Sequence, residues 1–241
     1  MCDDPIVTLQ SDAATTVRGA DGLPATPIGE SRWPPALALL AFIGLNVAAR
    51  LWLPRESALR VPWLLPFAEV LLLVALLASD HRNLVGRRRR LRPLVVALVV
   101  ALVAAALWAT ILLVYDLIKG STLTNSPTEL LASGGLIWLG NNVAFGLLYW
   151  LIDGGGPAVR LTRSTPVDFA FTQQMSPELA PSGWRPVFLD YLHLAFTNAT
   201  AFSPTDVMPL TLRAKYTMLV QSTVALALFG LVVARAVNAF S

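Results

Sequence analysis

The sequence has one cysteine and few charged residues, and both shortages narrow the classes of protein to which it can belong. Cys2 stands alone, so the chain cannot form an internal disulfide or supply the thiolates of a structural zinc site. Charged residues make up 14% of the chain, hydrophobic residues make up 55%, and the mean hydropathy is +0.62. Soluble domains carry about 25% charged residues. The composition therefore indicates an integral membrane protein, and it predicts no metal and no cofactor.

The first 32 residues lack hydrophobic periodicity and contain five acidic side chains among Thr, Ala, Gly and Pro. This composition predicts a disordered tail over residues 1–32. The first apolar run starts at Trp33, is too long for the core of a signal peptide, and follows acidic rather than basic residues. We therefore expect this run to stay in the mature protein as a membrane span.

Long apolar runs predict an all-α membrane protein with about five transmembrane helices. Each of these runs approaches or exceeds the roughly 20 helical residues that cross a bilayer core. The first three form an N-terminal membrane region over residues 33–129, and the last two belong to a C-terminal module over 130–241. The five runs cover residues 33–53, 61–79, 93–118, 130–152 and 211–240.

A sixth apolar segment, residues 187–201, is too short to cross. At about 1.5 Å per residue a helix of this length reaches only about 22 Å. It follows Pro186, a residue favoured at the first position of a helix, and precedes a stretch with two prolines over 202–210. These features predict a short re-entrant helix and a bent loop, which other protein must bury or which must line a wet cavity.

The segment "DYLHLAFTNATAFSPTDVMPLTLRAK" resembles the pore-loop module of potassium channels and aligns with it without a gap. In that family a pore helix reading F-T-T-L-T-T precedes the filter V-G-Y-G-D and then P-x-T. The matching residues here are Phe196, Thr197, Thr200, Asp206, Pro209 and Thr211. The resemblance implies an outer helix at 130–152, a long turret loop at 153–186, a pore-type helix at 187–201 and an inner helix at 211–240. It also implies pore-lining or filter-like roles for Thr197, Asn198, Thr200, Phe202, Ser203, Pro204, Thr205 and Asp206.

The filter-like loop departs from the potassium-channel pattern, because Ser203, Pro204 and Thr205 stand where that family has Gly-Tyr-Gly. The filter carbonyls of that family can all face the ion because glycine adopts backbone angles that other residues avoid. Thr205 is β-branched and Pro204 has a fixed φ near −65°. The sequence therefore predicts that the module is not potassium-selective if it conducts.

The whole chain is also similar to a group of uncharacterised multipass proteins of high-GC bacteria. They carry an "FSPTDxMPLT" segment and a "DGGGP" like that at 153–157. This resemblance implies a place in the bacterial cytoplasmic membrane and supplies no mechanism.

Positive charge concentrates in "DHRNLVGRRRRLR", where six arginines lie between two apolar runs. The positive-inside rule places Arg82–Arg92, and with it the N-terminus, in the cytoplasm. Positive charge confined to a loop between apolar runs indicates how the chain is oriented in the membrane, and it predicts no nucleic-acid partner. The same rule puts residues 153–185 in the cytoplasm, whereas potassium channels have the turret outside. An inverted module, a complete crossing by 188–210 and an early segment that does not span all remain open.

Polar side chains inside apolar segments are further candidates, because such groups need partners or water at membrane depth. Glu69 would pair with Arg50 or Asn142, be protonated, or take part in function. Asn141, Asn142 and Gln221 would join helices or line a cavity. Asp190 and His193 share a helix face and would pair or relay a proton, or Asp190 would stabilise the first helical turn.

These candidates do not predict an enzyme, since no G-x-S-x-G motif accompanies Ser203, His193 and Asp190. We expect a channel-like membrane protein, which would be a homo-tetramer if it conducts as the resembled family does. The alternative is a non-conducting structural or partner-binding multipass protein, in which the polar residues only satisfy bent backbone.

Overall fold

The computed structural model describes residue 31 and residues 33–52, 64–78, 85–119, 127–160, 166–201 and 206–240. The predicted tail lies outside this part of the chain except for Ser31, and the filter-like residues Phe202, Ser203, Pro204 and Thr205 lie wholly outside it. The elements in chain order are α1 (Trp33–Trp52), α2 (Leu64–Ala78), α3 (Val85–Lys119), α4 (Pro127–Ile152), the 3-10 turn η2 (Asp153–Gly155), α5 (Pro157–Arg160), β1 (Phe169–Phe171), α6 (Thr172–Met175), the 3-10 turn η3 (Pro177–Leu179), α7 (Phe188–Ala201), β2 (Val207–Pro209) and α8 (Leu212–Phe240).

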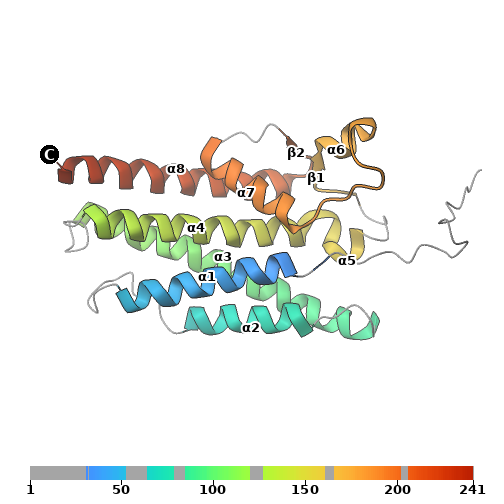
Figure 1. Cartoon of the computed structure of the whole chain (residues 1–241), viewed down its shortest axis with the longest axis horizontal. Coiled ribbons are helices and arrows are strands. Elements are labelled where there is room, and N and C mark those ends of the chain that lie inside the picture. Colours follow the sequence, from blue (N-terminus) through green and yellow to red (C-terminus); the bar gives the residue numbers. More distant parts are fainter. Residues whose placement is uncertain are drawn as a thin grey trace, which may run out of the picture.

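The helices form a bundle with α4 at its centre, in contact with α1, α3, α7 and α8 (Figure 1). Helices α1, α3 and α8 run one way along the bundle, and α2 and α4 run the other way (Figure 1). Helix α7 leans over α4 and α8, starting at the end of the bundle where α8 also starts. This end, which also holds the first turn of α3 and the last turn of α4, is called the entry end below.

Three of the described helices are long and apolar enough to cross a membrane. They are Arg92–Lys119, Thr128–Gly155 and Leu212–Ala234. The sequence predicted about five such helices, and the described part of the structure contains three of them. The apolar part of α1, Trp33–Ala48, and the 15-residue helix α2 are too short to be counted as spans. The mostly helical fold that the apolar runs predicted is confirmed.

Large apolar side chains cover the outside of the bundle as well as its core. Leu212 and Phe229 on α8, Ile118 on α3 and Phe67 on α2 are all more than 60% exposed. The core lies between α4 and its neighbours and includes Leu147, Phe145 and other fully buried side chains. A helix that is apolar on both faces needs lipid or further protein around it.

Glycines on α4 let neighbouring helices approach closely. A Cβ on Gly146 would lie 3.2 Å from the Cα of Leu192 on α7, and one on Gly140 would lie 2.6 Å from the ring of Phe42 on α1. Small residues at such contacts are typical of helix packing in membranes. The close contact at Gly146 holds α7 against the central helix.

A small antiparallel sheet, which the sequence did not predict, joins the loop after α4 to the segment before α8. Phe169 pairs with Pro209, Ala170 with Met208 and Phe171 with Val207. The loop at 153–186 is therefore attached to the start of α8, and it is not a free turret.

Candidate functional site

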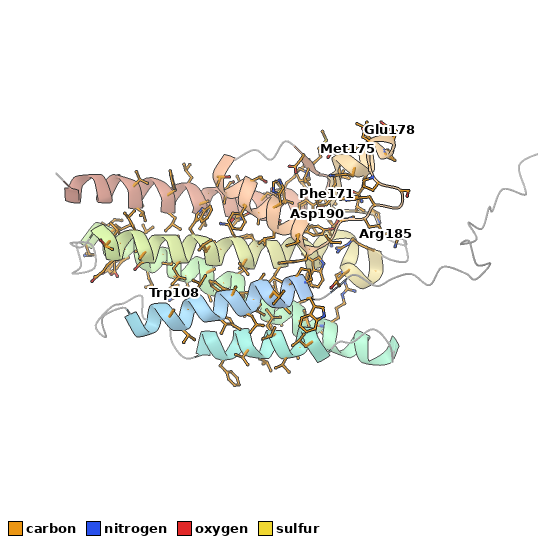
Figure 2. All side chains as sticks on the ribbon, viewed as in Figure 1. Trp108, Phe171, Met175, Glu178, Arg185 and Asp190 are labelled. Atoms are coloured by element: carbon orange, nitrogen blue, oxygen red, sulfur yellow. The ribbon has the colours of Figure 1, made fainter. Side chains whose placement is uncertain are left out.

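The candidate site comprises α7, the described residues from Asp206 up to α8, and the groups that hold them in place. Tyr191, one turn into α7, packs edge-to-face on Phe171 of β1, with ring centroids 5.3 Å apart. Thr172 N–H donates to the carbonyl of Asp206, so Asp206 lies beside β1 as well. Because β1 pairs with β2, the chain enters α7 and reaches α8 at the same end of the bundle. Figure 2 places Phe171 and Asp190 at this entry end.

Asp153, at the end of α4, binds both β1 and α7 through its buried carboxylate. Its Oδ1 accepts N–H bonds from Asp168 at 2.7 Å and Phe169 at 3.1 Å. Its Oδ2 accepts the hydroxyl of Tyr191 at 2.5 Å. The guanidinium of Arg160 lies 4.9 Å from the centroid of the Tyr191 ring, close enough for a cation–π contact. One carboxylate thus fixes the start of α7 relative to the end of α4.

Asp168 joins the same region to α8. Its fully buried carboxylate accepts bonds from Thr211 Oγ1 at 2.6 Å, from the N–H of Gly154 at 3.0 Å and from the guanidinium of Arg213. Burial alone would raise the pKa of Asp168, but these hydrogen bonds and the charge of Arg213 lower that pKa below its ordinary value. The carboxylate is therefore ionised, and it stabilises the start of α8.

Three glycines after α4 form the tight turn next to Asp153 and Asp168. Gly154, Gly155 and Gly156 all have positive φ, at 54°, 80° and 94°, which side chains disfavour. A Cβ on Gly156 would also lie 3.0 Å from the carbonyl oxygen of Leu151. Arg92, near the start of α3, donates to the carbonyl of Gly155 at 2.7 Å. The arginine-rich start of α3 and the turn after α4 therefore meet at the entry end.

The inner face of α7 carries a buried amide, Asn198, in a network shared by three helices. Asn198 Nδ2 donates to Gln221 Oε1 at 2.9 Å and to the carbonyl of Met218 at 3.0 Å. Tyr149 donates its hydroxyl to Gln221 Oε1 at 2.6 Å, and Gln221 Nε2 donates to the carbonyl of Ala195 at 2.9 Å. Gln221 lies about 14 Å along α8, near the middle of a helix that is long and apolar enough to cross a membrane. Helix α7 is thus bonded directly to α8, and Tyr149 joins α4 to the same network.

A second set of polar side chains, called here the outer stripe, comprises His193, Thr197 and Thr200 on the outer face of α7 and Asp206 just before β2. Along α7 these positions follow a helical repeat of three or four residues, and His193 and Thr200 are exposed. His193 Nε2 lies 3.3 Å from Asp206 Oδ2. Thr197 and Thr200 donate their hydroxyls to backbone carbonyls of the same helix, which leaves oxygen lone pairs free. In the described part of the chain, the outer stripe therefore presents oxygen acceptors and a histidine beside a carboxylate, and its members His193 and Thr200 are exposed.

The remaining predicted site residues bond mainly to their own or neighbouring helices. Asp190 accepts the N–H of Val187 and so stabilises the start of α7, while its predicted partner His193 faces Asp206 instead. Asn141 donates to Thr110 of α3 at 3.0 Å. Asn142 donates to the carbonyl of Trp138, so of the alternatives considered for Glu69 the structure does not show Asn142 as its partner. Glu69 accepts from Asn46 of α1 at 2.8 Å.

Sequence reasoning did not select the carboxylates that hold the module together or their partners. In the sequence, Asp153 stands out only as part of "DGGGP", and Asp168 lies without a motif inside the loop expected at 153–186. A signal was present, because an acid directly before three glycines is typical of a turn that binds its own backbone. The partners Arg213, Tyr149 and Tyr191 carry no comparable local signal.

Comparison with protein-family models, with curated proteins and with solved structures found no match to this chain. Among the described residues, no group of three or more His, Cys, Asp and Glu side chains could hold a metal ion.

Proposed function

We propose that this chain is a multipass membrane protein whose α7 and following segment form a pore-loop-like module, assembled around the outer stripe from several copies. The observation that carries the proposal is the outer stripe itself. His193 and Thr200 on α7 are exposed and Asp206 just before β2 is partly exposed, whereas buried residues of α7 such as Asn198 face α4 and α8. Polar groups at membrane depth face protein or water rather than lipid.

The stripe suits water or a cation better than an anion. The threonine hydroxyls donate inward to backbone carbonyls, so the oxygens facing outward act as acceptors. Asp206 adds a carboxylate at the mouth of the module. Repetition of these groups around an axis would produce a ring of oxygen atoms, the arrangement that selects cations in many channels.

The lack of filter glycines argues against selection of potassium over sodium. Residues 202–205 read Phe-Ser-Pro-Thr, and no residue there favours positive φ. We therefore propose a conduit for cations or small solutes without potassium selectivity, in which α1 and α2 complete a set of five spans. The basic entry end would face the cytoplasm of a bacterium, by the positive-inside rule.

Two measurements test the conduit. Native mass spectrometry of the protein released from nanodiscs should show an oligomer, for which we expect a tetramer. Purified protein in a planar bilayer should carry current that Asp206→Asn and Thr200→Val change and that Thr128→Val, an exposed threonine at the start of α4, leaves unaltered. A stable monomer without current would reject the conduit.

One observation favours a second candidate, a non-conducting scaffold that binds a partner protein. The buried amide of Asn198 on α7 finds its partners on α8 of the same chain, and Gln221 of α8 bonds the backbone of α7, so α7 is held in place without a second copy. In that case the outer stripe would be covered by another membrane protein. A monomer that loses a co-purifying partner on His193→Ala would support this candidate.

A further inference from the structure

Glu69 is a buried carboxyl that the proposed module does not use. It lies on α2 and is 1% exposed. Its Oε1 accepts a hydrogen bond from Asn46 Nδ2 of α1 at 2.8 Å. Its Oε2 is buried and has no hydrogen-bond partner among the described residues. One oxygen of this carboxyl is therefore satisfied by a neutral donor, and the other has no partner in the described part of the chain.

The helices around Glu69 supply no ionisable group at its level. Helix α2 packs against α1 and α3. Trp33–Ala48 of α1 and Pro93–Val114 of α3 contain no acidic, basic or histidine residue, and α2 contains none besides Glu69. Arg50 follows Asn46 by one helical turn on α1, and its side chain lies outside the described part of the structure. A test must therefore determine whether Arg50 forms an ion pair with Glu69.

An ionised Glu69 would place a negative charge in an apolar helix interface with one amide as its only described partner. Such a charge is unfavourable unless a cation or a proton neutralises it. A hard metal cation needs about six oxygen ligands, and a carboxyl with one amide neighbour does not provide them. A proton needs no further ligand, because it binds to the carboxylate itself.

We propose that Glu69 is a proton-binding site within the α1–α2 pair, occupied at neutral pH. The proton resides on Oε2, and Oε1, as the carbonyl oxygen, accepts from Asn46. The site belongs to the N-terminal helices and is independent of whether the α7 module conducts. Proton release would charge the α1–α2 interface, so occupancy of the site and packing of these two helices are coupled.

A hydrophobic carbodiimide, dicyclohexylcarbodiimide, tests the site chemically. The O–H of a protonated carboxyl adds across the N=C=N bond, and the adduct rearranges to a stable N-acylurea without a by-product. At neutral pH, peptide mass spectrometry of the full-length protein in membranes should find the adduct on Glu69. Glu178, an exposed acid on η3, is the matched control and should stay unmodified. Glu69→Gln should lose the adduct.

Infrared spectroscopy determines the protonation state of Glu69 even if the carbodiimide does not reach this buried carboxyl. The difference spectrum between the parent protein and Glu69→Gln at neutral pH should show the C=O stretch of a carboxylic acid. Asn46→Leu should shift that band, because it removes the hydrogen bond to the carbonyl. Arg50→Gln should leave the band in place. A carboxylate band in the parent protein, or one that becomes an acid band in Arg50→Gln, would overturn the proposal.

Discussion

The guanidinium of Arg213 forms a bidentate ion pair with the buried carboxylate of Asp168: Nε donates to Oδ1 and Nη2 donates to Oδ2. Arg213 belongs to the first turn of α8, and Asp168 directly precedes β1. The same carboxylate accepts the N–H of Gly154 after α4. One ion pair thus joins three segments that are distant in sequence, and it fixes where α8 begins relative to α4 and α7.

Arg213→Met should destabilise the protein because it removes the cation from a buried carboxylate. Breaking a buried pair costs about 3–5 kcal/mol. The side chain of Arg213 is 58% exposed, so water screens the pair and we expect a smaller loss of about 1–3 kcal/mol. Thermal unfolding at neutral pH measures the loss. Lys215→Met, two residues further along α8 and exposed, should change stability little.

The stability lost in Arg213→Met should depend on pH. The folded pKa of Asp168 lies below its ordinary value of 3.8, so the ionised carboxylate contributes stability above that value. This contribution disappears as the pH falls through the folded pKa, where Asp168 becomes protonated in both proteins. The gap in unfolding temperature should therefore be widest at neutral pH and shrink in acid below 3.8. A gap that is constant with pH would show that the charge of Asp168 is not involved.

Gly146→Ala and Gly135→Ala form a matched pair on α4. Replacement of a helical glycine by alanine favours the helix by about 1 kcal/mol. At Gly135 the new Cβ meets nothing within 4 Å, so we expect a neutral or slightly stabilised protein. At Gly146 it would meet the backbone of Leu192 at 3.2 Å, and α7 would have to move. A net loss of about 1–3 kcal/mol is expected there. Equal effects of the two variants on thermal unfolding would contradict the close α4–α7 contact.

The amide network between α4, α7 and α8 should behave as one unit. Asn198→Leu removes a donor to Gln221, and Gln221→Leu removes the acceptor of both Asn198 and Tyr149. Each change should cost about 1–3 kcal/mol, because a buried polar group loses its partner. The double variant should be less destabilised than the sum, by about 0.5–3 kcal/mol. Thermal unfolding of the four proteins in nanodiscs measures this coupling. Strict additivity would mean that the two side chains do not interact.

Much of the helical framework was predictable, because long apolar runs separated by polar loops have few other structures. The run at 130–152 predicted α4, which spans Pro127–Ile152, and the short run at 187–201 corresponds to α7 at Phe188–Ala201. The structure extends α3 from the predicted start at 93 back to Val85. Arginine is a good helix former, so the basic stretch continues the helix beyond its apolar part.

The parts that sequence did not predict depend on pairs distant along the chain. Strands β1 and β2 have three residues each, too few for a pattern to stand out, and they form because each finds the other. Asp168 and Arg213 are 45 positions apart, and Asn46 and Glu69 are 23 apart. No local spacing rule relates such residues, since their contact is set by how the helices cross.

Cysteine labelling should determine which way the module faces. In a Cys2→Ser background, single cysteines would replace Ser31 before α1, Glu178 on η3 and Ser121 between α3 and α4. The structure places the start of α1 and η3 at the entry end, and α3 ends at the other (Figure 1).

A membrane-impermeant maleimide should therefore react with the cysteines at 31 and 178 from one side and with that at 121 from the opposite side. Because Arg92 also lies at the entry end, we expect the shared side to be the cytoplasm. Comparison of intact cells with inverted vesicles distinguishes the two sides. Labelling of position 178 from outside would give the module the orientation of potassium channels, whereas labelling from the cytoplasm would make it an inverted pore loop.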